Sequence, residues 1–337
     1  MTTDRIKAAL ASVPEDHYTR DQDGGLVRQS SSVQAIAAGL ERLDVHPGMR
    51  VLEIGTGSGF SGALLGELVG PTGSVVSMDV MGTLTDRARD LHSHRGAANI
   101  HVVTGDGAHG HPGRAPYDRV VAWAATDVLW RTWADQCVPG AVLVVPVTLT
   151  PLPRSTAIVR AHRTRTGTLE AERLWTGGYV EMHPEELTQW LVPPRGVDAA
   201  TVDARGNTWW VSSMRGGDAK AAVKVLSRGV EAASLLEPEE SAADLHLYLY
   251  AADTDGLCML GLGDRGWAPG HATASGAAAV TGDGRLATAG DPAPARTLRH
   301  HVDRWRAAGR PGADHLTPVL EETRDGWLVR TRITREG

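Results

Sequence analysis

Ten residues, VLEIGTGSGF at positions 51–60, constrain the fold of this chain more than any other feature. An apolar run that favours a buried strand leads into a loop with glycine at every second position, and a helix-like stretch follows. Gly55, Gly57 and Gly59 carry no side chains, so the loop backbone can approach a ligand closely. This order predicts a nucleotide-type binding loop. The alternative is a glycine-rich turn that serves only helix-to-sheet packing.

The sequence from residue 49 to about 150 alternates short β-branched runs with helix-like stretches, which is typical of a parallel sheet with crossover helices. Strands are expected at 49–54, 74–78, 100–104, 119–123 and 141–146, with helices at 60–69 and 83–95. The five strands are apolar on nearly every residue, as strands covered on both faces must be. The predicted fold class is therefore α/β, a Rossmann-like sheet with flanking helices.

Further elements are expected on both sides of this core. Amphipathic helices are predicted at 6–11 and 33–43, with the polar stretch DQDGGLVRQSSS at 21–32 between them. After the core, 157–161 and 169–175 are predicted to form an antiparallel pair that closes the sheet.

A proline-rich junction at 191–195 suggests two domains, 1–190 with the binding loop and 191–337 as a C-terminal α+β domain. In the second domain, strands are expected at 208–212, 245–250 and 258–262. Hairpin turns are expected at Gly282-Asp283-Gly284 and Asp325-Gly326. Leu298, Val302 and Trp305 recur at the spacing of an amphipathic helix.

Acidic residues lie near the ends of three expected strands: Glu53, Asp79 and Asp106. Dinucleotide sites normally use GxGxxG and place a pyrophosphate on the helix N-terminus, whereas this loop reads GxGxG with Glu53 two residues before it. An acid there would repel a pyrophosphate and suits a cationic ligand. S-adenosylmethionine carries an ammonium, a sulfonium and no phosphate, so it is the expected ligand.

In this pocket Asp79 is expected to accept hydrogen bonds from both ribose hydroxyls. Asp106 would accept a hydrogen bond from the adenine amino group, and Gly107 would offer a backbone donor. The loop around Trp123 would line the pocket beside the methyl donor. A solvated acid at a strand end is the alternative for Asp79. The predicted cofactor-binding set is Glu53, Gly55, Thr56, Gly57, Ser58, Gly59, Asp79, Val80, Asp106, Gly107 and Trp123.

Four stretches occur in the order and at the spacing of one known family: VLEIGTGSGF, GDG at 105–107, YDRVVAWAA at 117–125 and VPGAVLVVP at 138–146. Over roughly residues 28–185 the chain resembles the protein-L-isoaspartate (D-aspartate) O-methyltransferase family. The resemblance implies a class I methyltransferase sheet and S-adenosyl-L-methionine as cofactor, with S-adenosyl-L-homocysteine as product. It also implies an enzyme whose partner is a peptide or protein that carries an Asp or isoAsp carboxylate.

Family members carry a serine-rich loop before the first core helix, and its serine helps to hold the substrate carboxylate. The corresponding stretch here is Gln29-Ser30-Ser31-Ser32-Val33, so the resemblance assigns the catalytic role to Ser31 or Ser32. The proline that usually follows in the family is absent, a departure that bears on the choice of substrate. A polar linker with incidental serines is the alternative.

The expected chemistry needs no catalytic base, because a carboxyl group with a pKa near 4 is already ionised at neutral pH. The protein has to align the carboxylate and exclude water. No metal is expected, and four histidines are expected at the surface: His92, His94, His109 and His111.

The bulk composition excludes several classes of partner. A formal charge of −6 gives no attraction for nucleic acid or an anionic membrane. No segment has the roughly 18 uninterrupted apolar residues of a membrane span, and the N-terminus lacks the apolar stretch of a signal peptide. Cys137 and Cys258 lie far apart, without CxxC spacing, so a cytoplasmic location is expected.

Several functions remain open. One is general repair of isoaspartyl proteins, and another is dedicated methylation of an Asp in a ribosomally made peptide natural product precursor, leading to aspartimide. The extra C-terminal domain favours the second, because a dedicated modifier needs remote binding energy to select one precursor. A small-molecule O- or N-methyltransferase and a non-catalytic adaptor are further alternatives, and the three acids argue against the adaptor.

Overall fold

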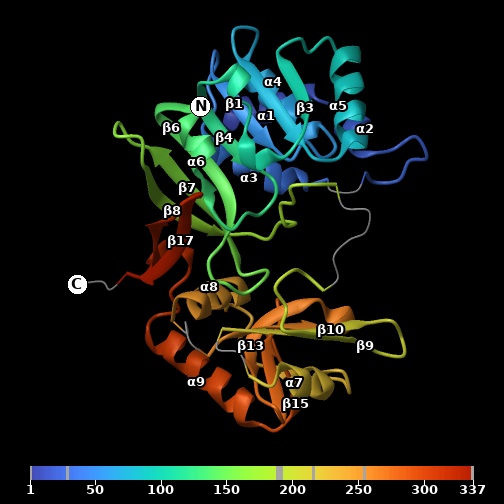
Figure 1. Ribbon diagram of the computed structural model, residues 1–337, viewed down its shortest axis with the longest axis vertical. Helices are drawn as coiled ribbons and strands as arrows, with labels where there is room; N and C mark the ends of the chain where they lie inside the picture. The colour runs from blue at the N-terminus through green and yellow to red at the C-terminus, as the bar shows by residue number, and fades with distance from the viewer. Residues whose placement is uncertain (1, 28–29, 187–192, 215–216, 253–255, 335–337) are drawn as a thin grey trace.

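The computed structural model describes residues 2–27, 30–186, 193–214, 217–252 and 256–334. Within these residues the strands form two seven-stranded sheets and one three-stranded sheet, and the two large sheets lie in separate halves of the molecule (Figure 1). No described helix is both long enough and apolar enough to cross a lipid bilayer.

The first sheet has the order β3-β2-β1-β4-β6-β7-β8. Its first five strands run parallel to one another, and β7 and β8 are antiparallel additions at the β6 edge. The strands are β1 (Arg50–Ile54), β2 (Ser74–Asp79), β3 (Ile100–Thr104), β4 (Tyr117–Ala122), β6 (Cys137–Thr148), β7 (Thr156–Arg163) and β8 (Leu169–Thr176). The predicted α/β fold and the closing antiparallel pair are thereby confirmed.

Helices and the second half of the molecule cover the two faces of this sheet. Val51 and Leu52 are neighbours in β1 and point to opposite faces, where each joins a separate apolar cluster. One face packs against α1, α3 and α4. The helices of this half are α1 (Thr2–Ser12), α2 (Glu15–Thr19), α3 (Val33–Leu43), α4 (Phe60–Val69), α5 (Gly82–His94) and α6 (Arg131–Asp135).

The second sheet is antiparallel throughout, with the order β11-β15-β14-β13-β12-β10-β9. Helix α7 packs on one face, and α8 and α9 pack on the other. The strands are β9 (Ala199–Val202), β10 (Thr208–Ser213), β11 (Glu231–Ser234), β12 (Cys258–Leu262), β13 (Trp267–Ala272), β14 (Gly276–Val280) and β15 (Arg285–Gly290). The helices are α7 (Ala219–Leu226), α8 (Ala242–Ala252) and α9 (Ala293–Ala307).

The strand predicted at 245–250 is wrong, because this segment lies inside helix α8. Leu245, Leu247, Tyr248, Leu249 and Tyr250 are all buried. The helix contacts α9 on one side and the first half of the molecule, through β8, on the other. A helix that is apolar all round has no helical period in its sequence, so alternation alone misassigns it.

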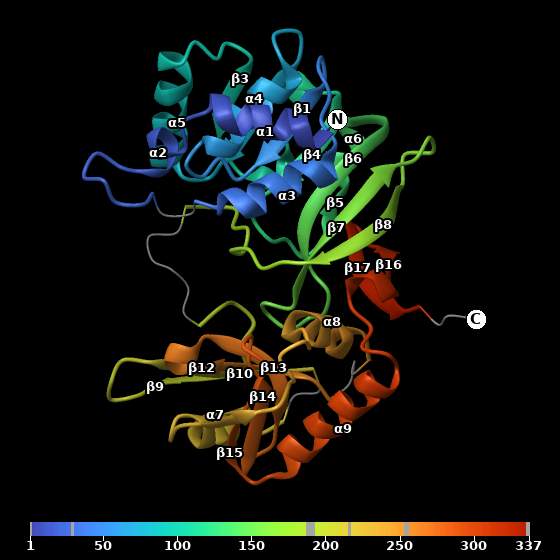
Figure 2. The ribbon, with the colours of Figure 1, turned by 180° about the vertical axis from the view of Figure 1, so that it is seen from behind.

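The end of the chain returns to the first half of the molecule (Figure 2). Strands β16 (Leu316–Glu322) and β17 (Gly326–Ile333) form the hairpin predicted at Asp325-Gly326, and β17 pairs with β5 (Leu129–Trp130). The hairpin predicted at Gly282-Asp283-Gly284 is also present, between β14 and β15. The junction between residues 190 and 191, with Leu191 and Val192, lies outside the described residues, so the domain division stays a prediction.

Candidate functional site

The glycine loop between β1 and α4 has a backbone that only glycine adopts readily. Gly55, Gly57 and Gly59 have φ angles of +94°, +51° and +86°. A Cβ atom at Gly59 would lie 3.0 Å from the Cβ atom of Ala88 in α5. The three glycines therefore allow both the turn and the close approach of α5.

The side chain of Asp79 holds the backbone of this loop in place. Its Oδ2 accepts a hydrogen bond from the backbone N–H of Gly57 at 3.0 Å, and its Oδ1 accepts from Met81 at 3.0 Å. Burial raises the pKa of Asp79, and the backbone hydrogen bonds oppose this shift. Each carboxylate oxygen has a second lone pair, so Asp79 can still accept from a ligand hydroxyl. Val80 is half-buried directly after it.

Two other polar residues of the loop have internal partners. The hydroxyl of Thr56 lies 2.8 Å from that of Ser77, below the loop. Ser58 is buried, and its carbonyl accepts a hydrogen bond from Arg87 in α5 at 3.0 Å. These residues stabilise the loop, and their predicted contact with a ligand stays a prediction.

The loop after β3 brings Asp106 and Gly107 to the same edge of the sheet. Asp106 caps the short turn η1 (Gly107–His109) by accepting a hydrogen bond from Ala108 N–H at 2.9 Å. A Cβ atom at Gly107 would lie 2.5 Å from Cγ2 of Ile54 in β1. The carbonyl of Gly107 accepts from Nε1 of Trp133 at 2.7 Å. Packing therefore requires glycine here, and α6 holds the loop in place.

Glu53 lies behind the glycine loop and is fully buried. Its Oε1 accepts hydrogen bonds from the Ser61 hydroxyl at 2.5 Å and from Trp123 Nε1 at 2.9 Å. Burial raises its pKa, and these hydrogen bonds act in the opposite direction. The carboxylate makes internal contacts in this structure, so its predicted role toward a cationic ligand stays a prediction.

The prediction that His92 lies at the surface is wrong. Its exposed fraction is 2%, and its Nδ1 lies 3.3 Å from the Tyr18 hydroxyl. Leu84, Ala88 and His92 follow one another at four-residue spacing on the buried face of α5, a pattern that the sequence already contained. His94 and His109 are exposed, and His111 is half-buried. The described residues contain no cluster of three or more metal-ligating side chains.

Burial lowers the pKa of His92 from 6.5 to about 4. Between these values the unfolded chain binds more protons than the folded protein, so stability falls as the pH drops from 6.5 toward 4. Because of His92, we expect the free energy of unfolding to be roughly 2 kcal/mol lower at pH 5 than at pH 7.

Chemical denaturation of the wild type and of His92→Gln at both pH values measures this effect. In the variant, the difference in the free energy of unfolding between the two pH values should be smaller by roughly 2 kcal/mol. The raised pKa of Glu53 acts in the opposite direction and is shared by both proteins, so it cancels in the comparison. Equal pH dependence in the two proteins would contradict the assignment.

The two predicted catalytic serines differ in their surroundings. Ser32 is the N-cap of α3, and its Oγ accepts a hydrogen bond from Ala35 N–H at 3.2 Å. The hydroxyl of Ser31 makes no hydrogen bond to another described residue. Both serines line a cavity of about 410 Å³, which we call the acceptor cavity. Gln29, from the same predicted loop, lies outside the described residues.

The acceptor cavity contains a cation that the sequence reasoning missed. Arg42 is the one charged side chain among the described residues that line it. Its guanidinium lies 4.7 Å from the ring centre of Trp175 and has no ion-pair or hydrogen-bond partner among the described side chains. Burial lowers its pKa. An arginine on an amphipathic helix is typical of a solvated surface, so the sequence gives no sign of this position.

Trp123 joins the acceptor cavity to the glycine loop. Its Cβ atom lies 3.4 Å from the position that a Cβ atom would take at Gly55. Trp123 also lines the acceptor cavity, and the centre of its indole ring lies 6.4 Å from that of the Tyr179 ring. A ligand on the glycine loop and one in the acceptor cavity would therefore meet at this residue.

The sequence of this chain matches a known protein family over more than half of its length. The model of the family described as protein-L-isoaspartate(D-aspartate) O-methyltransferase (PCMT) matches residues 1–186. The protein-L-isoaspartate O-methyltransferase of Methanoculleus marisnigri is 43% identical over 155 residues, which cover 43% of this chain and 69% of that protein. The enzyme of the same name from Pyrococcus horikoshii is 38% identical over 117 residues, which cover 35% of this chain and 52% of that protein.

This chain thus spans only about half the length of some curated relatives that it matches. A solved structure of a protein-L-isoaspartate O-methyltransferase aligns with 99% of this chain and 96% of its own, with 19% identity and a TM-score of 0.49. The sheet order and the glycine loop define a class I methyltransferase fold. The chain belongs to the protein-L-isoaspartate(D-aspartate) O-methyltransferase family.

Proposed function

We propose that this protein is an S-adenosylmethionine-dependent O-methyltransferase that acts on an Asp or isoAsp carboxylate in a peptide or protein. The observation that carries the proposal is the position of Trp123, which lies against Gly55 of the glycine loop and also lines the acceptor cavity. That cavity holds a hydroxyl and a cation, Ser31 and Arg42, which are the groups that bind a carboxylate.

The glycine loop fits a cofactor that presses against backbone, because three positive φ angles keep side chains away from it. Asp79 would hold the ribose hydroxyls, and Asp106 and Gly107 would hold the adenine. When bound, S-adenosylmethionine supplies an electrophilic methyl group. Family membership supports this choice of cofactor.

The residues of the chain have to position the acceptor. Its carboxylate is ionised at neutral pH and needs no base. Ser31 and Arg42 would fix its orientation by hydrogen bonding and charge, and Trp123 and Tyr179 would exclude water from one side of the cavity.

We further propose that the substrate is one dedicated peptide, a ribosomally made natural product precursor. In the methyl ester of an Asp side chain, attack by the next amide nitrogen closes an aspartimide and releases methanol. The second sheet supports this specialisation, because a selective enzyme gains from a remote binding surface. Cys137 and Cys258 are buried thiols, which is consistent with a reaction in the cytoplasm. General isoaspartyl repair is the second candidate, and efficient turnover of unrelated isoaspartyl peptides would favour it.

The two serines provide a matched test of the acceptor site. Ser31→Ala should lower kcat/KM for peptide methylation by about 10-fold or more, because a hydrogen bond to a charged group is lost. Ser32→Ala should lower the free energy of unfolding by about 1 kcal/mol through loss of the α3 cap, with a smaller effect on kcat/KM. Peptide methylation followed by mass spectrometry, with chemical denaturation alongside, measures both effects. The reverse pattern would show that the roles are exchanged.

A further inference from the structure

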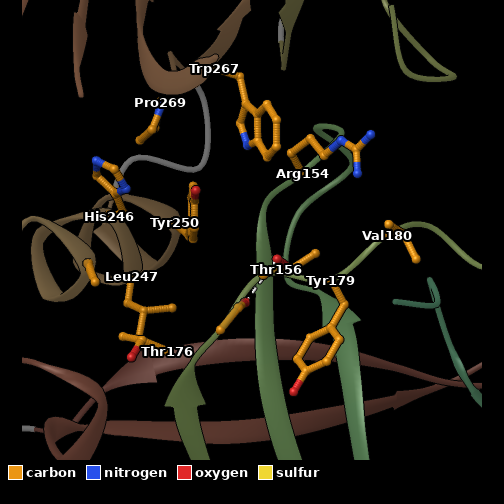
Figure 3. A pocket seen from close by; sticks show the side chains of 13 residues that line it. Arg154, Thr156, Thr176, Tyr179, Val180, His246, Leu247, Tyr250, Trp267 and Pro269 are labelled. Atoms are coloured by element: carbon orange, nitrogen blue, oxygen red, sulfur yellow. Dashed lines mark hydrogen bonds between the residues drawn. The ribbon is translucent and has the colours of Figure 1, made fainter. Parts of the chain in front are cut away.

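A second cavity, of about 610 Å³, lies between the two halves of the molecule (Figure 3). We call it the interdomain cavity. The first half contributes Arg154, Thr156 and residues 176–180. The second half contributes residues of α8 and β13, namely Ala243, His246, Leu247, Tyr250, Trp267 and Pro269.

The interdomain cavity and the acceptor cavity share one wall, residues 176–180. The two glycines in this wall differ. A Cβ atom at Gly177 would lie 2.6 Å from Ile158, so packing explains the absence of a side chain there. A Cβ atom at Gly178 would meet nothing within 4 Å, and its φ angle is not positive. Neither packing nor backbone conformation requires glycine at 178, so the shared wall carries no side chain at this position, which we call the ridge.

The interdomain cavity is apolar and aromatic in character. Trp267 is 50% exposed, although a tryptophan is usually well buried. Arg154 lies over its ring at 5.0 Å and is paired with Glu181 at 3.7 Å. His246 forms a hydrogen bond with the Val280 carbonyl at 2.7 Å, and burial lowers its pKa to about 4, so it is neutral at neutral pH. The cationic groups in the lining are therefore paired or uncharged, which favours an uncharged occupant.

One further group in the cavity is suited to orienting such an occupant. The side chain of Tyr250 is more than nine-tenths buried and lines the cavity, and its hydroxyl makes no hydrogen bond to another described residue. A phenolic hydroxyl can both donate and accept a hydrogen bond, so Tyr250 can bind a polar group of such an occupant.

We propose that the acceptor peptide crosses the ridge at Gly178 and places an apolar or aromatic side chain against Trp267 in the interdomain cavity. This inference rests on the proposed function and gives its substrate a second recognition point, separated from the methylated carboxylate by a fixed number of residues. Aromatic stacking and burial against Trp267 supply the binding energy. The two halves of the molecule then act together to select one peptide.

The test uses synthetic peptides of Gly and Ser that carry one Asp or isoAsp and a single Phe. The Phe is placed from about two to about eight residues before or after the Asp or isoAsp. Methyl transfer gives kcat and KM, and fluorescence polarisation of labelled peptides gives affinity. At one spacing, Phe should lower KM and Kd by about 10-fold relative to the Phe-free peptide, with kcat unchanged.

Two variants and one control locate the effect. Trp267→Ser should remove the advantage of the Phe peptide, and Gly178→Leu, which raises the ridge, should do the same. Val202→Ser is the matched control, because Val202 is an apolar strand residue that is 63% exposed on β9 and outside both cavities, and it should keep the advantage.

The outcomes separate this inference from the proposed function. Methylation that is equal at every Phe position overturns the inference and leaves the function intact. A Phe effect that survives in Trp267→Ser also overturns it. If no Asp or isoAsp peptide is methylated or bound, although the cofactor binds, the proposed function fails and the inference fails with it.

Discussion

Gly57→Val should weaken the binding of S-adenosylmethionine by 100-fold or more, and the protein should remain folded. Gly57 has a φ angle of +51° and donates its N–H to Asp79 at the open edge of the loop. A β-branched side chain is strained in this conformation, and it would project from the loop that we propose binds the cofactor. A 100-fold loss corresponds to about 2.7 kcal/mol of binding free energy.

Gly96→Val is the matched control for this variant. Gly96 has a φ angle of +72° after α5, and a Cβ atom there would meet nothing within 4 Å. Both variants should lose a similar amount of stability in chemical denaturation, whereas isothermal titration should show lost affinity in Gly57→Val alone. If Gly57→Val binds the cofactor as tightly as Gly96→Val, the ligand does not lie on this loop.

Trp133→Ala should lower the free energy of unfolding by about 3–5 kcal/mol, which is the cost of truncating a buried aromatic side chain. The side chain of Trp133 has no exposed surface, and its Nε1 donates to the Gly107 carbonyl. Urea denaturation measures this loss. Because the indole holds the loop of Asp106, the variant should also bind the cofactor more weakly.

Two further variants show which part of the tryptophan matters. Trp133→Phe keeps much of the volume and loses the hydrogen bond, so it should cost less than Trp133→Ala. Trp267→Ala removes a tryptophan that is half-exposed, and it should cost less than about 1 kcal/mol. Similar losses for Trp133→Ala and Trp267→Ala would contradict the assignment of Trp133 to the core.

Most of the first sheet could be predicted from the sequence because its determinants are local. Each parallel strand is a short apolar run bounded by turn residues, and the glycine-rich sequence marks the loop between β1 and α4. The helices predicted at 60–69 and 33–43 have those bounds in the structure. The acids at the strand ends reach one edge because parallel strands place their C-terminal ends together.

The remaining features depend on contacts between distant parts of the chain. Residues 245–250 of helix α8 are largely buried because the two halves of the molecule enclose the helix, and their alternating sequence resembles that of a strand. The pairing of β17 with β5 joins residues about 200 positions apart in the chain, which no local pattern encodes. Arg42 and the interdomain cavity also depend on this tertiary arrangement.

Transfer of a labelled methyl group from S-adenosylmethionine to Asp and isoAsp peptides tests the central claim most directly, with Gly57→Val and Gly96→Val assayed in parallel. We predict label in the peptide that mild base releases, as expected for a carboxyl ester, with transfer retained in Gly96→Val and lost in Gly57→Val. A wild-type protein that neither binds this donor nor labels any peptide would contradict the account.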